Sequence, residues 1–493
     1  MAGRDTHRRH CRTQRDDLKR TAYPLSLPAG IAALRIRNLH RKQAISLDTL
    51  SQLRAGKLAG TRRLNLSCGL TRIPEDIFAL ADTLEVLDLS GNALSDLPDD
   101  LARLHKLRVV FLSNNQFEHV PEVLGQCAAL SMVGFKANRI RHVSGAALPP
   151  ALRWLILTDN QIRELPPELG SRPLLQKLML AGNQLQSLPP EMAALERLEL
   201  LRIAANRFSR LPDWLFALPR LSWLAYAGNP CCTMDDAAVL AQARVGHVDW
   251  QDLAIQAKLG EGASGVIYRA VHVDQATDRQ AIAVKVFKGA VTSDGSPENE
   301  MAACIAAGQH ANLIPIQAKV SAHPEGTPGL VMSLIAPSFR DLAGPPSLES
   351  CTRDVYANDT RFSQTAMLEL ARGIASAVGH LHERGIMHGD LYGHNILRDD
   401  EGRSLLGDFG AASFYSLQDT KRAEALQRLE VRAFGCLLEE LIDRCDMACD
   451  ATGEALGNLK ERCLQGDVAA RPLFAEIEKI LRDLEVTTQA PAS

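Results

Sequence analysis

The sequence predicts a multidomain fold, in which an α/β solenoid of short repeats is followed by an α+β domain with two lobes. The 493 residues are enough for two or three domains. Asparagines recur at intervals of 22 or 23 residues through the first half. After Leu259 the hydrophobic pattern changes, first to the alternation typical of strands and then to helical spacing.

Composition narrows the possible classes of protein. The formal net charge of -3 gives no global attraction to nucleic acid or to a membrane. An odd number of cysteines, 11, argues against a fully paired disulfide framework and favours free thiols in the reducing cytosol. No apolar run approaches the length of a membrane span. We therefore expect a cytoplasmic protein without a membrane span or a nucleic-acid partner.

The basic residues 1–45 predict a poorly ordered extension. The alternative is that this segment is a basic arm that contacts nucleic acid.

A repeated frame, L-x-x-L-x-L-x-x-N-x-L-x-x-L-P, organises the first half. Its asparagines are Asn92, Asn115, Asn138, Asn160, Asn183, Asn206 and Asn229. The L-x-L piece alternates as a strand does, and the asparagine can bond the backbone where each strand turns. The leucines fill one continuous core that no single repeat could bury. The frame resembles the leucine-rich repeat family over about residues 60–235. This implies a domain at 46–248 with about eight repeats of 22–24 residues.

The strand positions that point away from this core form an unexpected apolar stripe. Its large members are Phe111, Trp154, Ile156, Met179, Leu200 and Trp223. Because exposed apolar patches usually mark contact surfaces, we expect this concave face to bind a protein partner or the second half of the chain itself. The alternative is that β-propensity alone selects large side chains there. If the contact interpretation holds, Ser at positions 154 and 223 leaves thermal stability nearly unchanged.

Residues 231–248 break the repeat period. Met234–Leu240 has a helical pattern and predicts a cap on the end of the solenoid. No long flexible linker follows, so the two halves are expected to sit in a fixed relation.

The second half carries five short motifs in a chemically consistent order. They are Gly260-Glu261-Gly262-Ala263-Ser264-Gly265, Ala283-Val284-Lys285, His388-Gly389-Asp390, Asn395, and Asp408-Phe409-Gly410. Strands are expected at Ile255–Leu259, Val266–Val273 and Ala281–Phe287, and helices at Gln364–Arg384 and Val431–Cys445. A glycine turn and a lysine can hold a triphosphate, an aspartate can orient a hydroxyl, and Asn with Asp can hold Mg²⁺.

This order resembles the eukaryotic-type protein kinase family over about residues 250–485, which places a kinase domain at 249–486 and a tail at 487–493. The resemblance implies catalytic roles for Lys285, Asp390, Asn395 and Asp408, with Asn395 and Asp408 as Mg²⁺ ligands. The implied ATP-binding residues are Leu259, Gly260, Glu261, Gly262, Ala263, Ser264, Gly265, Ile267, Ala283, Lys285, Glu300, Met332, Ser333 and Leu334. Glu298 competes with Glu300 as the partner of Lys285.

The catalytic loop departs from the family pattern. Gly389 stands where many protein kinases carry Arg, so switching through a phosphate on that Arg is not expected. Tyr392 stands where serine/threonine kinases usually place a phosphate-contacting Lys, and His394 where tyrosine kinases place Arg. A neutral His stabilises charge less well than these cations do, so phosphotransfer is expected to be slow or pH-dependent.

The segment that follows the catalytic loop also departs from the family pattern. The Ala-Pro-Glu motif is absent, so Arg471 lacks its usual partner. Glu424 could substitute, or Arg471 could be a solvated surface residue. The acid that usually opens the central helix appears as Glu430. Self-phosphorylation is considered at Ser413, Tyr415, Ser416 and Thr420.

The combined pattern is similar to bacterial leucine-rich-repeat kinases. It implies an ATP-dependent protein kinase, with Ser/Thr acceptors favoured, whose repeats bind a protein or regulate the kinase. One alternative is a pseudokinase scaffold that binds nucleotide and partners without turnover. A second is a small-molecule kinase, suggested by the missing platform for a peptide.

Overall fold

The computed structural model describes residues 46–232, 240, 245–262, 264–273, 281–288, 292–446 and 451–489. The expected basic extension at 1–45, nearly all of the expected cap helix at 234–240, and Ala263 lie outside these residues. Residues 42–493 form one compact unit. The repeats and the second half are therefore described together.

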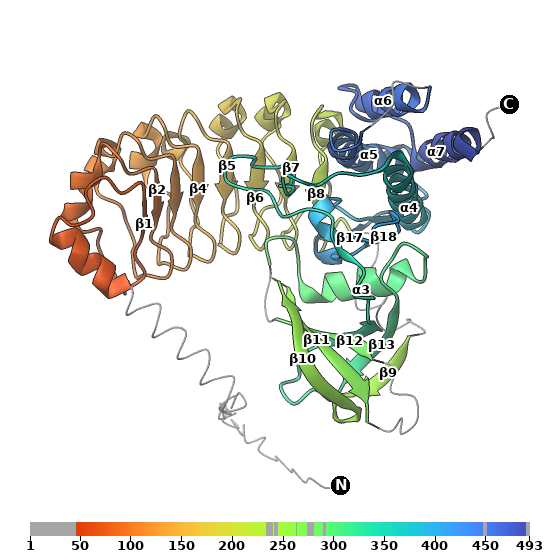
Figure 1. The fold of residues 1–493 in the computed structure, drawn as a ribbon. Helices are drawn as coiled ribbons and strands as arrows, with labels where there is room; N and C mark the ends of the chain where they lie inside the picture. The colour runs from red at the N-terminus through yellow and green to blue at the C-terminus, as the bar shows by residue number, and fades with distance from the viewer. Residues whose placement is uncertain are drawn as a thin grey trace, which may run out of the picture. The chain divides into compact units, whose positions relative to one another are not determined.

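Eight three-residue strands form a parallel sheet in strict sequence order (Figure 1). They are β1 (Arg63–Asn65), β2 (Val86–Asp88), β3 (Val109–Phe111), β4 (Met132–Gly134), β5 (Trp154–Ile156), β6 (Lys177–Met179), β7 (Leu200–Arg202) and β8 (Trp223–Ala225). Each strand pairs with the equivalent residues of the next, as Trp154 does with Lys177. Because the outward positions stay in line, their side chains form continuous rows along one face.

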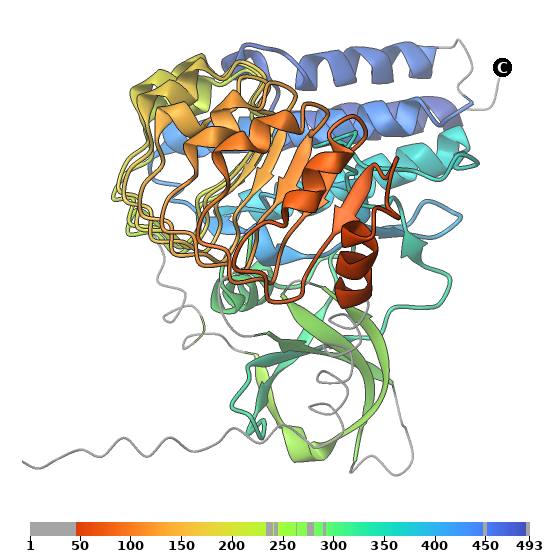
Figure 2. The same ribbon diagram turned by 90° about the vertical axis from the view of Figure 1, so that its left-hand side faces the viewer.

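Short 3-10 helices return the chain on the other side of each repeat. They are η1 (Glu75–Leu80), η2 (Asp99–Arg103), η3 (Glu122–Gln126), η4 (Gly145–Ala147), η5 (Pro167–Ser171), η6 (Pro190–Ala194) and η7 (Asp213–Ala217). Prolines such as Pro74 and Pro98 precede them with φ near the value that the proline ring imposes. Seen along the array, the strands and the helical turns superpose as two separate layers (Figure 2).

The asparagine ladder predicted from the repeat frame is confirmed. Asn183 is typical: its Nδ2 donates to the carbonyls of Leu157 and Leu180, each at 2.9 Å. Its Oδ1 accepts from the amide of Ile162 at 3.0 Å. Each such side chain satisfies backbone groups of two adjacent repeats that would otherwise be buried without partners, so the repeats are tied together at every turn.

The second half begins with a six-stranded sheet in the order β10-β11-β12-β14-β13-β9. Its strands are β9 (Gly246–Asp249), β10 (Leu253–Glu261), β11 (Gly265–His272), β12 (Ile282–Phe287), β13 (Ile316–Ser321) and β14 (Gly329–Ser333). Helix α3 (Pro297–Ala307) packs beside it (Figure 1). Strand β9 pairs in parallel with β13 and spans the domain boundary expected at 248/249.

A helical region follows the sheet. It contains α4 (Gln364–His382), α5 (Thr420–Ile442), α6 (Ala451–Cys463) and α7 (Phe474–Gln489). The short helix η8 (Trp250–Asp252) precedes β10, and the helical region also holds η9 (Gly393–Asn395), η10 (Phe409–Ala411) and η11 (Val468–Ala470). Short strands complete it: β15 (Arg340–Asp341), β17 (Ile396–Arg398) and β18 (Ser404–Leu406) in one sheet, and β16 (Ile386–Met387) with β19 (Ser413–Phe414) in another.

The predicted start of the central helix at Val431 is wrong, because α5 begins at Thr420. Asp419 caps it by accepting a hydrogen bond from the amide of Arg422 at 3.2 Å. The additional turns bury Leu426 and Leu429 within the leucine core of the repeats. A helix that packs on a neighbouring domain is stabilised by that contact, which the local sequence does not display.

The end of the repeat sheet packs directly on the second half. Met179, Leu200 and Trp223 belong to the same apolar core as α4 and the interior of α5. Strand β8 contacts α5 (Figure 1). The contact surface expected on the concave face is therefore covered by the chain's own second half at strands β6 to β8. Because Trp223 is 1% exposed in this core, the expectation that Ser at position 223 leaves stability nearly unchanged is wrong.

Candidate functional site

A glycine turn joins β10 to β11 at one end of the six-stranded sheet. Leu259, Gly260 and Glu261 end β10, and the amide of Gly262 donates to the carbonyl of Gly265 at 3.0 Å. A Cβ added at Gly260 or Gly262 would meet nothing within 4 Å, whereas one at Gly265 would lie 2.7 Å from a backbone oxygen of β12. The first two glycines thus leave open backbone for a ligand, and the third is required by close packing.

The turn is held by charged side chains around Glu261. Its carboxylate forms ion pairs with Lys258 and Lys288. Lys288 also donates to the carbonyl of Gly262 at 3.1 Å. The pKa of Glu261 falls to about 2 because of these two lysines, so the carboxylate stays ionised and the turn is tethered to β12.

Lys285 projects from β12 and forms an ion pair with Glu300 of α3. The lysine side chain is 13% exposed and the glutamate 2%. Burial lowers the pKa of Lys285, but the charges of Glu300 and Asp408 outweigh it and raise the pKa, so the amine stays charged. Glu298, the competing candidate, is exposed. Helix α3 is fixed at its start by a capping box between Ser296 and Asn299.

A cavity of about 80 Å³ lies beneath the sheet. Its lining includes Lys285 of the sheet and Asp408 of the later loop. It is lined by Ile267, Lys285, Glu300, Cys304, Ala307, Gly308, Leu313, Ile314, Ile316, Leu330, Met332, Gly407, Asp408 and Phe409. Lys285 and Asp408, which are 123 residues apart in sequence, therefore meet at one space. Ala283 is buried on β12, Ser333 ends β14, and Leu334 packs with Met332.

Asp390, Asn395 and Asp408 lie on two adjacent loops. The Nδ2 of Asn395 donates to the Asp390 carboxylate at 2.8 Å and to the Asp390 carbonyl at 2.9 Å. Asp408 adopts the left-handed conformation, with φ 53°, and accepts a hydrogen bond from the amide of Gly410 at 3.2 Å. A left-handed aspartate is uncommon and marks a backbone held in place by its surroundings.

A buried acid anchors the loop that carries Asp390. Both oxygens of Glu430 accept backbone hydrogen bonds, at 3.2 Å from His388 and 2.7 Å from Gly389. His382 also contacts Glu430, at 2.7 Å. Burial raises the pKa of Glu430, but these partners outweigh it and the pKa lies below its ordinary value. Although Glu430 lies in the middle of α5 instead of opening it, it fixes the loop.

The residues that replace the expected cations of the loop are also held tightly. Tyr392 stacks on Trp223 of the repeats, with ring centroids 4.2 Å apart and planes 8° apart. Trp223 Nε1 donates to the carbonyl of Leu391 at 2.9 Å. His394 contacts Asp354 at 2.7 Å. Burial lowers the pKa of His394, but the carboxylate of Asp354 outweighs it, so its pKa is raised and a positive charge is favoured.

Two residues at this site were missed as functional candidates: Arg202 and Asp294. Arg202, the last residue of β7, forms an ion pair with Asp390 and another with Asp294 at 2.7 Å. Its Nη1 donates to the carbonyl of Gly389 at 2.9 Å. The available signal was an arginine at an outward strand position beside large apolar residues, but nothing local connects it with a loop 188 residues away.

The expected partner of Arg471 is wrong. Glu424 bonds Arg428 at 2.8 Å, within α5. Arg471 is 2% exposed and donates instead to three carbonyls, those of Gln465, Arg428 and, in the repeats, Pro219. Burial lowers its pKa to about 10. The repeats thus supply one hydrogen-bond acceptor for Arg471, the carbonyl of Pro219, whereas the usual glutamate partner is absent from the second half.

Two of the suggested self-phosphorylation sites are also wrong, because they are buried. Ser413 is 1% exposed and accepts a hydrogen bond from the amide of Tyr226 at 3.1 Å. Tyr415 is 6% exposed and donates to the carbonyl of His382 at 3.1 Å. Thr420 is exposed, and Ser416 is half-buried.

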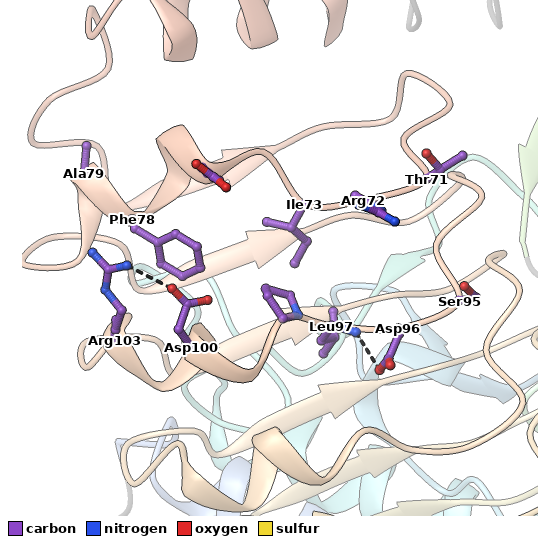
Figure 3. A pocket seen from close by; sticks show the side chains of 12 residues that line it. Thr71, Arg72, Ile73, Phe78, Ala79, Ser95, Asp96, Leu97, Asp100 and Arg103 are labelled. Atoms are coloured by element: carbon purple, nitrogen blue, oxygen red, sulfur yellow. Dashed lines mark hydrogen bonds and ion pairs between the residues drawn. The ribbon is translucent and has the colours of Figure 1, made fainter.

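A separate hollow of about 890 Å³ lies among the first repeats (Figure 3). Arg103 and Asp100 form an ion pair there at 2.9 Å, and Asp96 accepts from the amide of Leu97 at 2.8 Å. None of the residues of the five motifs lines this hollow.

Comparison with known proteins matches both halves. A family model for the protein kinase domain matches residues 253–429, and one for leucine-rich repeats matches 59–117 and 173–230. This chain is a leucine-rich-repeat protein with a protein kinase domain. Among the described residues, no helix is long and apolar enough to cross a bilayer.

The curated proteins that this chain resembles are protein kinases. Cyclin-dependent kinase 11B of Rattus norvegicus is 27% identical over 237 residues, 46% of this chain and 49% of that protein. Serine/threonine-protein kinase PITSLRE of Drosophila melanogaster is 26% identical over 183 residues, 37% of this chain and 18% of that protein. The chain thus spans about half the length of the first relative and less of the second.

Proposed function

We propose that the protein is an ATP-dependent protein kinase that transfers the γ-phosphoryl group to a protein hydroxyl, with Ser/Thr acceptors favoured. The single observation that carries this proposal is the convergence of four polar side chains from distant segments. Lys285 and Asp408 line one cavity, and Asn395 is bonded to Asp390 on the neighbouring loop. The match to serine/threonine-protein kinases supports the choice of acceptor.

The proposed reaction is an in-line displacement at the γ-phosphorus. The acceptor oxygen forms the new bond to phosphorus, the bond to the β–γ bridging oxygen breaks, and ADP leaves. The acceptor proton passes to the carboxylate of Asp390. Lys285, held by Glu300, is a fixed positive charge for the nucleotide phosphates, and the open backbone at Gly260 and Gly262 faces them.

A protein kinase domain implies ATP and a divalent metal, and the donor set here fits Mg²⁺. The amide nitrogen of Asn395 is used by Asp390, so its carbonyl oxygen is the atom left for a cation. Asp408 offers a carboxylate. Hard oxygen donors of this kind suit Mg²⁺, which would neutralise charge on the transferred group. We propose Asn395 and Asp408 as its ligands.

We propose that the boundary expected at 248/249 lies instead before β9, because β9 pairs with β13 of the kinase sheet. We further propose that the repeats are fixed on the kinase as a permanent regulatory part. Hydrogen bonds from the kinase to the repeats support this role. Arg432 donates to Ser222 at 2.9 Å, and Arg422 to the carbonyl of Leu211 at 2.7 Å. The half-buried Phe111, Trp154 and Ile156 leave room for a second protein on the face of the earlier repeats.

A small-molecule acceptor is the second candidate function. The specific observation in its favour is the position of the segment after Asp408. Only 11 residues separate Asp408 from α5, and Tyr226 of the repeats bonds both Ser413 and the carbonyl of Phe414. This covered segment offers little edge for an extended peptide.

One assay tests both functions. The full chain is incubated with γ-labelled ATP and Mg²⁺, with protein acceptors in one arm and a metabolite extract in the other. A protein kinase labels protein in the wild type, and Asp390→Asn abolishes this labelling. Label confined to the extract supports the second candidate. Nucleotide binding without transfer in any arm would support the scaffold alternative and refute the proposed activity.

A further inference from the structure

Arg202 lies in the interior of the molecule, between the repeats and the catalytic loop. Its side chain is 2% exposed. Nε contacts Asp294, Nη1 contacts the carbonyl of Gly389, and Nη2 contacts the carboxylate of Asp390. A guanidinium is planar and rigid, so three contacts in different directions fix its position and its plane.

The buried guanidinium and the carboxylates around it depend on one another. Two carboxylates, those of Asp390 and Asp294, face a single arginine. Without Arg202, two like charges would share a poorly hydrated space, and one would tend to take up a proton. A positive charge from the repeats is therefore part of the electrostatics of the catalytic loop.

This contact belongs to an interface that resembles a protein core. Leu200 is 2% exposed, Trp223 1% and Tyr226 3%. Separation of the repeats from the kinase would expose these side chains and break the Trp223 bond to Leu391. Arg202 is thus held in place with the whole interface and is not a lid that leaves during turnover.

On the catalytic loop, His394 can bring positive charge towards Asp390, but position 392 does not. Tyr392, which stands where the kinase resemblance implies a phosphate-contacting lysine, is buried and stacked on Trp223. Burial raises the pKa of Tyr392 well above its ordinary value, so the phenol is neutral. The neighbouring strand of the repeats brings Arg202 to the carboxylate that this loop presents.

We propose that Arg202 is a positioning residue of the phosphotransfer site, which orients Asp390 and supplies beside it the positive charge that Tyr392 cannot provide. The kinase would then have an active site composed of two domains. This inference rests on the proposed function. It extends that function, because it makes the repeats necessary for the chemical step.

The way Arg202 acts follows from the two oxygens of Asp390. One contacts Arg202 and the other accepts from Asn395 at 2.8 Å, so the carboxylate cannot rotate. Burial raises the pKa of Asp390, and the guanidinium opposes that rise. The charged or titratable groups that face it are Arg202, Lys177, Asp294, Tyr392, His394 and Asp408. An ionised carboxylate is needed to accept the acceptor's proton.

The same contact allows a competing interpretation with the opposite sign. If Arg202 merely occupied the place of the acceptor hydroxyl, it would inhibit the enzyme, and its removal would raise the rate. Measurement of the rate in an Arg202 variant therefore separates the two roles directly.

The test compares three variants of the full chain. Arg202→Gln removes the charge, and Arg202→Lys keeps the charge without the planar fork. Arg63→Gln is the matched control, because Arg63 lies exposed on β1 of the same sheet. For each we would measure kcat, KM for ATP and for the acceptor, and the melting temperature.

We expect Arg202→Gln to lower kcat about 100-fold, as removal of one preorganised charge-stabilising group does, with little change in the KM for ATP. Arg202→Lys should recover part of kcat, because it restores the positive charge beside Asp390. A loss due only to unfolding would scale with the melted fraction and disappear below the melting transition. This result would overturn the proposal, as would a rate equal to or above wild type.

The failure of the kinase function is separable from these outcomes. A wild type inactive with every acceptor, alongside an active Arg202→Gln, would preserve the kinase and reject the positioning role. Inactivity of both would reject the proposed function, and the inference with it. If Arg202→Gln does not fold, Arg202→Lys decides: a folded variant with wild-type kcat and wild-type KM for ATP refutes the proposal.

Discussion

Replacement of Trp223 by Ala tests the interface on which the composite site depends. The indole is 1% exposed, stacks on Tyr392 and donates to the carbonyl of Leu391. Truncation of a buried Trp typically costs 3–5 kcal/mol. Because this one also loses a stacked pair and leaves a buried carbonyl without its donor, we expect about 5 kcal/mol.

The assay is urea unfolding at equilibrium, followed by circular dichroism and by the loss of kinase activity. Trp154→Ala is the matched control, since Trp154 occupies the same strand position three repeats earlier but is only half-buried. We expect Trp154→Ala to cost about 2 kcal/mol less than Trp223→Ala. Equal midpoints for the two variants, or an unchanged midpoint for Trp223→Ala, would show that the repeats only touch the kinase and would refute this reasoning.

Three further predictions follow from single sites. Asn183→Ala should lower the free energy of unfolding by about 3 kcal/mol, because three buried backbone groups lose a partner; a midpoint within error of wild type would refute the ladder. Arg471→Met should cost at least about 3 kcal/mol, measured in the same way, since three buried carbonyls lose their donor. The pKa of His394 is raised in the fold, so its contribution is present below the unfolded pKa and lost as pH rises through the folded value. Stability in wild type should therefore fall over that range, and Asp354→Asn should flatten the profile.

Local spacing was sufficient for most of the architecture. The L-x-L frame predicts where each repeat strand lies. The strands, such as Val86–Asp88, begin one residue before the first position of the L-x-L piece and end before its last. The strand with Lys285 and the long helix α4 also lie where their patterns indicate. Each of these features depends on residues within about 25 positions of one another, so it can be predicted from the local sequence.

Features that depend on long-range packing could not be predicted from the local sequence. Helix α5 extends to Thr420 because Leu426 and Leu429 enter the core of the repeats, a partner more than 150 residues away. Burial of Ser413 and the carbonyl partners of Arg471 have the same origin. In each case the exposure of the element depends on a surface from a distant part of the chain, which the neighbouring sequence does not indicate.

The sequence by itself determined the two architectures, the ladder of asparagines and the order of the phosphate, acceptor and metal motifs, because each depends on spacing along the backbone. It also marked the stripe with Trp154 and Trp223 as a contact face, without choosing the partner. Only the tertiary structure decided that the last strands cover the catalytic loop and that Arg202 meets Asp390. That choice depends on matching two surfaces in shape and charge, which is a property of the folded chain and not of any segment in it.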